Sequence, residues 1–266
     1  MMVLPALQDE LTSATARLLA TAASLTDADI AAPSLLPGWS RGHVLAHLAG
    51  NAHSHINLLT WARTGVKIPQ YASTEFRAAE IESGAARSAA EHLAHLEDSV
   101  SLLAAAIAEL PGPAWSAHVE GLRPPSHPAW YGLVRRLREV GLHHVDLDAG
   151  YGPADWPEVF VLRELNDTVR FWSREASTIG EIVVLDPGTG AEVAAWRDLG
   201  AGPAVRGAPA DMLAWLTGRT KGAGVSVVPV GQSSTSGAST SLPEPPPWPA
   251  MPTPADLPAT PPRDYR

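Results

Sequence analysis

The chain has 266 residues, of which 45% are hydrophobic and 18% are charged, and its formal net charge is −9. This acidic balance, without a long basic segment, argues against nucleic acid as a partner. No apolar run approaches the roughly 20 residues that a membrane-spanning helix needs. The N-terminal sequence MMVLPALQDELTSA lacks the basic segment and apolar core of a signal peptide, so we expect a cytoplasmic protein.

The chain contains no cysteine. Disulfides, thiolate metal ligands and a protein thiol nucleophile are therefore excluded. A bound metal ion would have to be held by histidine and carboxylate side chains. If the chemistry needs a sulfur atom, that atom must arrive on a small molecule.

The first part of the chain is predicted to be helical. Apolar residues recur there at three- and four-residue spacing, which is typical of amphipathic helices. Ser40 is a suitable N-cap for the second helix, and Gly65 is a suitable end. We place four long helices, with a short helical piece between the second and third, at residues 6–25, 41–64, 86–110 and 128–148. Four helices of this length predict a bundle, whose binding sites are built from inward side chains of facing helices.

The pattern changes after Trp156. We predict a helix at 157–176, a hairpin formed by GEIVVLD and AEVAAWR, a helix in PADMLAWLTGR and a last strand in GVSVVPV. The sequence from 231 onward is rich first in serine and then in proline, which is typical of a disordered tail. We therefore divide the chain into a mainly α bundle domain at 1–155, a small α+β domain at 156–230 and a flexible tail at 231–266.

A carboxylate and an imidazole lie four residues apart in the stretch RLREVGLHHVDLDAG. Residues at this spacing share one face of a helix, so Glu139 and His143 can hold two positions of a metal ion. The histidine-rich helix GWSRGHVLAHLAGNAHSH can supply a third ligand, for which His47 is a candidate. Two histidines and one carboxylate with an open fourth position are the pattern of a catalytic zinc site.

The spacing leaves several choices open. His43 lies four residues before His47 on nearly the same face, and His144 directly follows His143. Glu139 could instead pair with an arginine of its own helix at a solvated surface. The histidines could equally be ordinary core residues.

Three motifs carry a family resemblance, namely PGWSRGHVLAHLAGNA, RLREVGLHHVDL and PADMLAWLTGR. The chain resembles the mycothiol-dependent maleylpyruvate isomerase family, whose bundle belongs to the DinB-like metalloprotein superfamily, over most of residues 1–230. The resemblance implies a DinB-like four-helix bundle with a zinc site. Its ligands would be His47, Glu139 and His143, so His43 and His144 would not be ligands.

The resemblance also implies arginines that receive substrate carboxylates, because the planar guanidinium can bind a carboxylate through two hydrogen bonds. Arg219 in WLTGR matches the C-terminal one, and Arg77 in FRAAEIE resembles its counterpart in the bundle. In the ordinary alternatives, Arg77 is an exposed helix charge and Arg219 a cation at a helix C-terminus. Asp146 could orient a site residue, but we expect it to be exposed.

The function implied by the resemblance is thiol chemistry. A zinc ion deprotonates a coordinated thiol, and the family's thiol is mycothiol. The thiolate would add to an electrophilic, carboxylate-bearing small molecule. By resemblance the reaction is the cis–trans isomerisation of maleylpyruvate to fumarylpyruvate. A mycothiol S-transferase that forms a stable conjugate needs the same thiolate, and a non-catalytic metal-binding scaffold is a further alternative. We expect a monomer.

Overall fold

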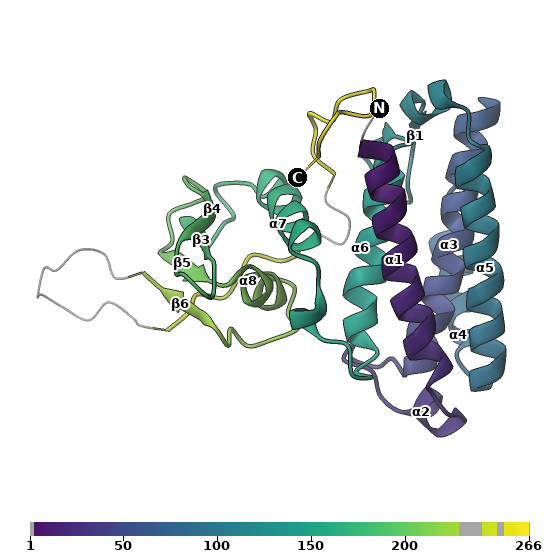
Figure 1. Cartoon of the computed structure of the whole chain (residues 1–266), viewed down its shortest axis with the longest axis horizontal. Coiled ribbons are helices and arrows are strands. Elements are labelled where there is room, and N and C mark those ends of the chain that lie inside the picture. The colour runs from purple at the N-terminus through teal and green to yellow at the C-terminus, as the bar shows by residue number, and fades with distance from the viewer. Residues whose placement is uncertain (1–2, 229–240, 249–252, 266) are drawn as a thin grey trace, which may run out of the picture. The chain divides into compact units, whose positions relative to one another are not determined.

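The computed structural model describes residues 3–228, 241–248 and 253–265 (Figure 1). The chain forms two compact units. The first consists of Met1–Gly152 together with Ala255–Tyr265, and the second of Pro153–Pro254. In the part of the chain that the structure describes, no helix is both long and apolar enough to cross a membrane.

The first unit is a helix bundle. Its long helices are α1 (Val3–Ala23), α3 (Arg41–Thr64), α5 (Ala89–Glu109) and α6 (Tyr131–Asp146). Two shorter helices, α2 (Asp27–Ala31) and α4 (Thr74–Gly84), lie in the connections. The long helices run side by side around a core of leucine, valine and alanine side chains (Figure 1). The predicted fold class, a four-helix bundle followed by a small α+β part, is confirmed.

The ends of α3 follow from local chemistry. Ser40 is the N-cap, and its hydroxyl accepts a hydrogen bond from the His43 backbone N–H. The His43 imidazole in turn accepts one from the Ser40 backbone N–H, which completes a reciprocal cap. At the other end Gly65 adopts φ 73°, a left-handed conformation that costs little without a side chain. The predicted ends of this helix agree with the structure.

The start of α6 differs from the sequence prediction. Pro128 was expected in the first turn of this helix, but the helix begins at Tyr131. His127 and Pro128 form the short strand β2 (His127–Pro128), which pairs antiparallel with β1 (His118–Val119) after a 3₁₀ turn at Gly112–Ser116. The backbone before α6 is therefore held by strand pairing rather than by helical hydrogen bonds.

The second unit is built on a four-stranded sheet of order β4-β3-β5-β6. Its strands are β3 (Glu181–Leu185), β4 (Glu192–Trp196), β5 (Ala204–Gly207) and β6 (Val225–Val227). The predicted hairpin is present as the antiparallel pair of β3 and β4. The strand β5, which pairs parallel with β3, was missing from the prediction. Its four residues are too few to give a readable alternation.

Two helices complete this unit. They are α7 (Glu158–Phe171) and α8 (Pro209–Leu216), and a 3₁₀ turn, Pro153–Asp155, precedes α7. Pro209 occupies the first helical position of α8, where its missing N–H is not needed. Met212 and Leu213 of α8 are fully buried.

The segment predicted as a flexible tail is described in part, and its residues 229–240 and 249–252 lie outside the described residues. Residues 255–265 belong to the bundle unit. The Trp130 indole N–H donates to the Pro258 carbonyl at 2.9 Å, and the Tyr265 ring packs edge-on against Trp130 with centroids 5.1 Å apart. This end of the segment thus covers the start of α6.

Candidate metal centre

Two helices of the bundle bring three potential metal ligands together. The side chain of His47 comes from α3, and those of Glu139 and His143 come from α6. The Glu139 carboxylate Oε2 lies 2.8 Å from His47 Nε2 and 3.4 Å from His143 Nε2. One ligand atom from each residue lies within 4.8 Å of the others. Among the described residues, no other group of three or more His, Asp or Glu side chains converges in this way.

The protonation states of His47 and Glu139 suit a cation, whereas the pKa of His143 is raised because Asp146 and Glu139 beside it outweigh its burial. Burial lowers the pKa of His47 to about 4, so its imidazole is neutral near pH 7. Burial by itself raises the pKa of Glu139, but His47 and His143 beside it hold this pKa well below its usual range. A neutral imidazole and an ionised carboxylate are the forms that bind metal ions.

The carboxylate of Asp146 orients one imidazole of the cluster. Its Oδ2 lies 2.8 Å from Nδ1 of His143, and Asp146 is only 1% exposed. With Nδ1–H donating to Asp146, the neutral His143 imidazole has its lone pair on Nε2, the atom that a metal ion would bind. The expectation that Asp146 is exposed was therefore wrong, because its carboxylate is buried against the His143 imidazole.

The two alternative histidines lie away from the cluster. His43 takes part in the cap of α3, and its Nε2 is 3.3 Å from Glu82. His144 Nε2 is 2.7 Å from the hydroxyl of Thr21, and its ring stacks on Tyr151 with centroids 3.7 Å apart. The choice of His47 and His143 as candidate ligands is consistent with these positions.

The two candidate arginines lie in different units. Arg77, on α4, places Nη2 3.2 Å from Nδ1 of His47, and its guanidinium lies over the Tyr71 ring. It therefore reaches the cluster, unlike an exposed helix charge. Arg219 follows α8 in the second unit and donates a hydrogen bond to the Thr217 carbonyl at 2.9 Å. Its role stays a prediction.

Trp39 contacts the cluster and was not singled out by sequence reasoning. Its ring packs edge-on against that of His47 with centroids 5.8 Å apart, and it also stacks on His43. The indole gives the site an apolar wall, which limits water around the imidazole. Its only signal in the sequence is its place one residue before the cap of α3.

The donor set fits a divalent metal ion. Two imidazole nitrogens and one carboxylate oxygen, with a second carboxylate holding one imidazole, form the ligand pattern of zinc and related ions in open sites. A helix bundle that gathers these groups at one point places the chain among bundle proteins with a candidate metal centre.

The family follows from comparison with known proteins. Residues 11–148 match the family described as mycothiol maleylpyruvate isomerase N-terminal domain, and the chain belongs to this family of enzymes. Two similar crystal structures are those of the mycothiol-dependent maleylpyruvate isomerase and of a histidine-to-alanine mutant of it. Each is 29% identical to this chain, and the alignments cover 91% of this chain and 96% of theirs, with TM-scores of 0.78 and 0.77. Among curated proteins, none matches the sequence significantly.

Proposed function

We propose that this protein is a zinc-dependent enzyme that activates mycothiol for addition to an electrophilic small molecule. By family, its reaction is the cis–trans isomerisation of maleylpyruvate to fumarylpyruvate. The observation that carries the proposal is the convergence of His47, Glu139 and His143 in a chain of this family. These three side chains would hold the ion. When bound, the metal ion lowers the pKa of a thiol, so that thiolate is present near neutral pH.

We expect metal binding to change the position of the His47 ring proton and to break the hydrogen bond between Arg77 and His47. An arginine can only donate, so Nδ1 of His47 accepts from Arg77 in this structure. A neutral His47 then carries its proton on Nε2 and donates it to Glu139. If Nε2 of His47 held the metal ion, the ring proton would sit on Nδ1, and Nδ1 could no longer accept a hydrogen bond from Arg77. The guanidinium of Arg77 would then be available to bind a substrate carboxylate.

Isomerisation uses reversible addition to the substrate. The thiolate adds to the activated cis double bond, and the electron pair moves towards the neighbouring carbonyl. The former double bond can then rotate as a single bond. Expulsion of the thiolate restores the double bond in the trans form, so no atom is gained or lost. Arg77 and Arg219 would bind the two carboxylate ends, each through its planar guanidinium.

The test is the turnover of maleylpyruvate by the purified, zinc-loaded protein with and without mycothiol. Mycothiol-dependent formation of fumarylpyruvate supports the isomerase. If the protein binds zinc and mycothiol but does not convert maleylpyruvate, the isomerase is refuted and a transferase becomes the better proposal. In a cobalt-substituted protein, thiol binding to the metal should change the absorption spectrum. If no thiol changes it, a non-catalytic metal-binding scaffold becomes the better proposal.

The role of Arg219 has a separate test. Arg219→Ala should keep full zinc content and raise KM for the carboxylate substrate by about tenfold, since one charge-assisted hydrogen-bonding group contributes about 1.5–3 kcal/mol. Arg206→Ala, which removes an exposed arginine of the same unit, serves as the control. An unchanged KM in the Arg219 variant would remove this residue from the site.

A further inference from the structure

A half-buried tyrosine lies close to the metal cluster. Tyr71 is in the connection between α3 and α4, and its ring faces the guanidinium of Arg77, whose Cζ is 5.7 Å from the ring centroid. The same guanidinium reaches His47, with Nη2 3.2 Å from Nδ1 of the imidazole. The side chains of Glu139 and His143 are 12% and 20% exposed, so a small molecule can approach the cluster. Tyr71 is thus separated from the candidate ligands by one side chain.

The residue before Tyr71 is held by several hydrogen bonds. Gln70 is only 5% exposed, and its side-chain N–H donates to the Ser54 hydroxyl at 3.1 Å. Its side-chain oxygen accepts from the Leu122 backbone N–H at 2.8 Å, and its carbonyl accepts from the Asn57 side chain at 3.3 Å. A side chain supported in this way is presented from a fixed point, as catalytic groups require.

The Tyr71 hydroxyl can serve a ligand. It has no hydrogen-bond partner among the described residues, although a phenol can donate one hydrogen bond. Two buried arginines of α6 lie near it. Burial lowers the pKa of Arg135 and of Arg136 to about 10, and the nearby Tyr71 phenol acts in the opposite direction on both. These two positive charges favour negative charge that develops beside the hydroxyl.

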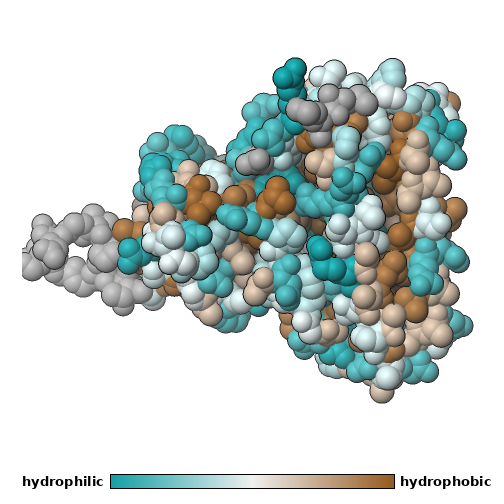
Figure 2. All heavy atoms as spheres, viewed as in Figure 1, coloured by the Kyte–Doolittle hydropathy of each residue, from teal (hydrophilic) through white to brown (hydrophobic). Residues whose placement is uncertain are grey.

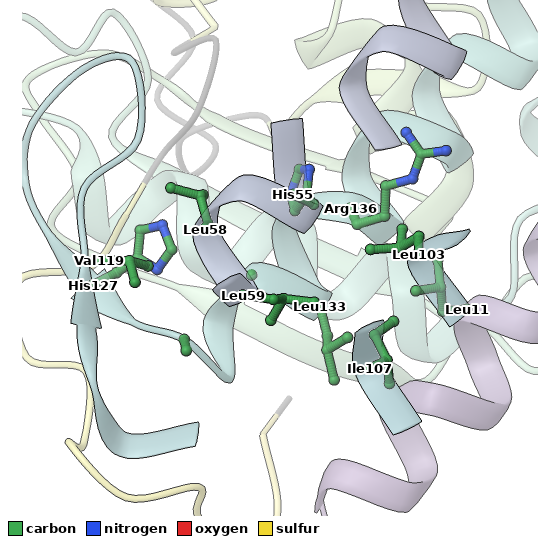
Figure 3. A pocket seen from close by; sticks show the side chains of 12 residues that line it. Leu11, His55, Leu58, Leu59, Leu103, Ile107, Val119, His127, Leu133 and Arg136 are labelled. Atoms are coloured by element: carbon green, nitrogen blue, oxygen red, sulfur yellow. The ribbon is translucent and has the colours of Figure 1, made fainter. Parts of the chain in front are cut away.

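The other hollows of the bundle are poor places for the substrate. Leu19 and Val100 help to line a surface groove of about 360 Å³ between α1 and α5, and Figure 2 shows apolar residues gathered there. The inner cavity, whose lining includes Leu133, has a volume of about 10 Å³, which is room for one water molecule (Figure 3). A substrate with two carboxylates needs charged and hydrogen-bonding partners. Arg77 and Tyr71 supply both kinds.

We propose that Tyr71 is a catalytic residue of the isomerisation, and that its hydroxyl donates a hydrogen bond to the carbonyl oxygen that becomes negative when the thiolate adds. The inference rests on the proposed isomerase activity. A sulfur–carbon bond forms while the π electrons of the cis double bond move towards the neighbouring carbonyl, which becomes an enolate. After rotation the electrons return, the sulfur–carbon bond breaks and the thiolate leaves. Tyr71 keeps its proton throughout, so no atom is gained or lost.

The shape of the substrate lets Arg77 and Tyr71 act together. In maleylpyruvate one carbon of the cis double bond carries a carboxylate and the other carries a ketone, so these two groups lie on the same side. A guanidinium that holds the carboxylate would bring the ketone oxygen towards the adjacent phenol. A donor fixed in advance stabilises the negative oxygen of the enolate more than the neutral oxygen of the ketone.

The first experiment measures turnover of maleylpyruvate with mycothiol by the full-length, zinc-loaded protein. Tyr71→Phe keeps the ring beside Arg77 and removes only the hydroxyl. Its kcat should fall about 100-fold, as is typical when one donor to a developing negative oxygen is lost, while KM and zinc content stay within about twofold. Tyr265→Phe, which removes a hydroxyl from the ring that packs on Trp130, is the control and should keep kcat.

A second variant separates the hydroxyl from the ring. Tyr71→Leu also removes the ring beside Arg77, so it should raise KM in addition to lowering kcat. An unchanged kcat in Tyr71→Phe would overturn the proposal. If only Tyr71→Leu were impaired, Tyr71 would merely position Arg77, and the proposal would again be overturned.

Binding of acetopyruvate tests the hydroxyl without turnover. This diketo acid resembles the ketone half of the substrate, readily forms an enolate and has no double bond to isomerise. In isothermal titration calorimetry of the zinc-loaded protein with mycothiol, Tyr71→Phe should bind it about tenfold more weakly than the wild type, since a hydrogen bond to a charged oxygen is lost. Maleate, which has two carboxylates but no ketone, should bind both proteins equally.

The outcomes distinguish this inference from the isomerase itself. Equal affinity of Tyr71→Phe and the wild type for acetopyruvate would overturn the role of the hydroxyl, and so would the absence of binding to the wild type. Weaker binding to Tyr71→Phe, in a protein that does not convert maleylpyruvate, would support the hydroxyl as a donor to an enolate oxygen and refute only the isomerase.

Discussion

Helix α6 carries two polar regions in which a buried charge has different partners. In the metal cluster, the Glu139 carboxylate faces two imidazoles, and Asp146 holds one of them from behind. Three residues before Glu139 in the sequence, the buried Arg136 forms its hydrogen bonds to the described residues with a carbonyl and an amide oxygen, and the Glu139 charge acts on it without a direct ion pair. A buried charge is costly unless it is paired. The first region therefore lacks only a cation, whereas the second leaves two buried donor atoms, Nε and Nη2 of Arg136, without a hydrogen-bond partner among the described residues.

The largest effect, on both zinc binding and turnover, is expected from removing a candidate ligand of the metal cluster. His47→Ala removes one of three ligands and should abolish stoichiometric zinc binding and turnover together. His43→Ala is the matched control, because this histidine lies one turn earlier on α3 and outside the cluster. Zinc content by atomic absorption and a helical circular dichroism spectrum check the result. Full zinc content in His47→Ala would contradict the ligand assignment.

A smaller loss should follow when only the supporting carboxylate changes. Asp146→Asn keeps the shape of the side chain but weakens its hydrogen bond with Nδ1 of His143. Groups that hydrogen-bond to a metal ligand in this way typically contribute about 10–100-fold to metal affinity. Zinc affinity measured against a chelator tests this. Asp148→Asn, at an exposed position two residues later, should leave the affinity unchanged. If both variants bind zinc as tightly as the wild type, Asp146 does not support the site.

Part of the acid sensitivity of the fold should come from His55, whose pKa the Arg136 charge helps to lower. Burial and the Arg136 charge lower the pKa of His55 to about 3. In the unfolded chain this pKa is about 6.5. Between these values only the unfolded chain binds the proton, so the free energy of unfolding falls as the pH falls. The contribution of His55 is about 2 kcal/mol between pH 7 and pH 5.

Urea denaturation of metal-free protein at the two pH values measures this contribution. His55→Gln should lose about 2 kcal/mol less than the wild type between pH 7 and pH 5, since glutamine does not titrate. His53→Gln, at an exposed position of the same helix, should behave as the wild type. Equal acid sensitivity in wild type and His55→Gln would show that this imidazole is not held neutral in the fold.

The smallest effect is expected from removing the unpaired cation. Arg136→Met loses two hydrogen bonds to α3 but also a buried charge without a carboxylate partner, and these effects oppose each other. We expect the free energy of unfolding to change by only about 1 kcal/mol. Urea denaturation at pH 7 measures this, and a loss of several kcal/mol would show that Arg136 is paired more strongly than its contacts indicate.

Sequence patterns predicted much of the fold because it depends on local periodicity. The long helices were found from three- and four-residue spacing, and the ends of α3 from a serine and a glycine. The start of α6 and the strand β5 were missed, because both depend on strand pairing, of β2 with β1 and of β5 with β3, and such pairing leaves no periodic pattern in so short a segment. The described end of the proline-rich segment packs on Trp130 through a carbonyl and a ring, contacts that composition does not predict.

The sequence by itself determined that Glu139 and His143 share one face of a helix, because a spacing of four fixes this through helix geometry alone. It also determined that sulfur chemistry must use an external thiol, because the chain has no cysteine. Only the tertiary structure brought His47 rather than His43 to the pair and buried Asp146 behind His143. It also left two atoms of Arg136 without an acceptor among the described residues. These outcomes depend on how helices pack, and packing joins residues whose distance in the sequence carries no signal.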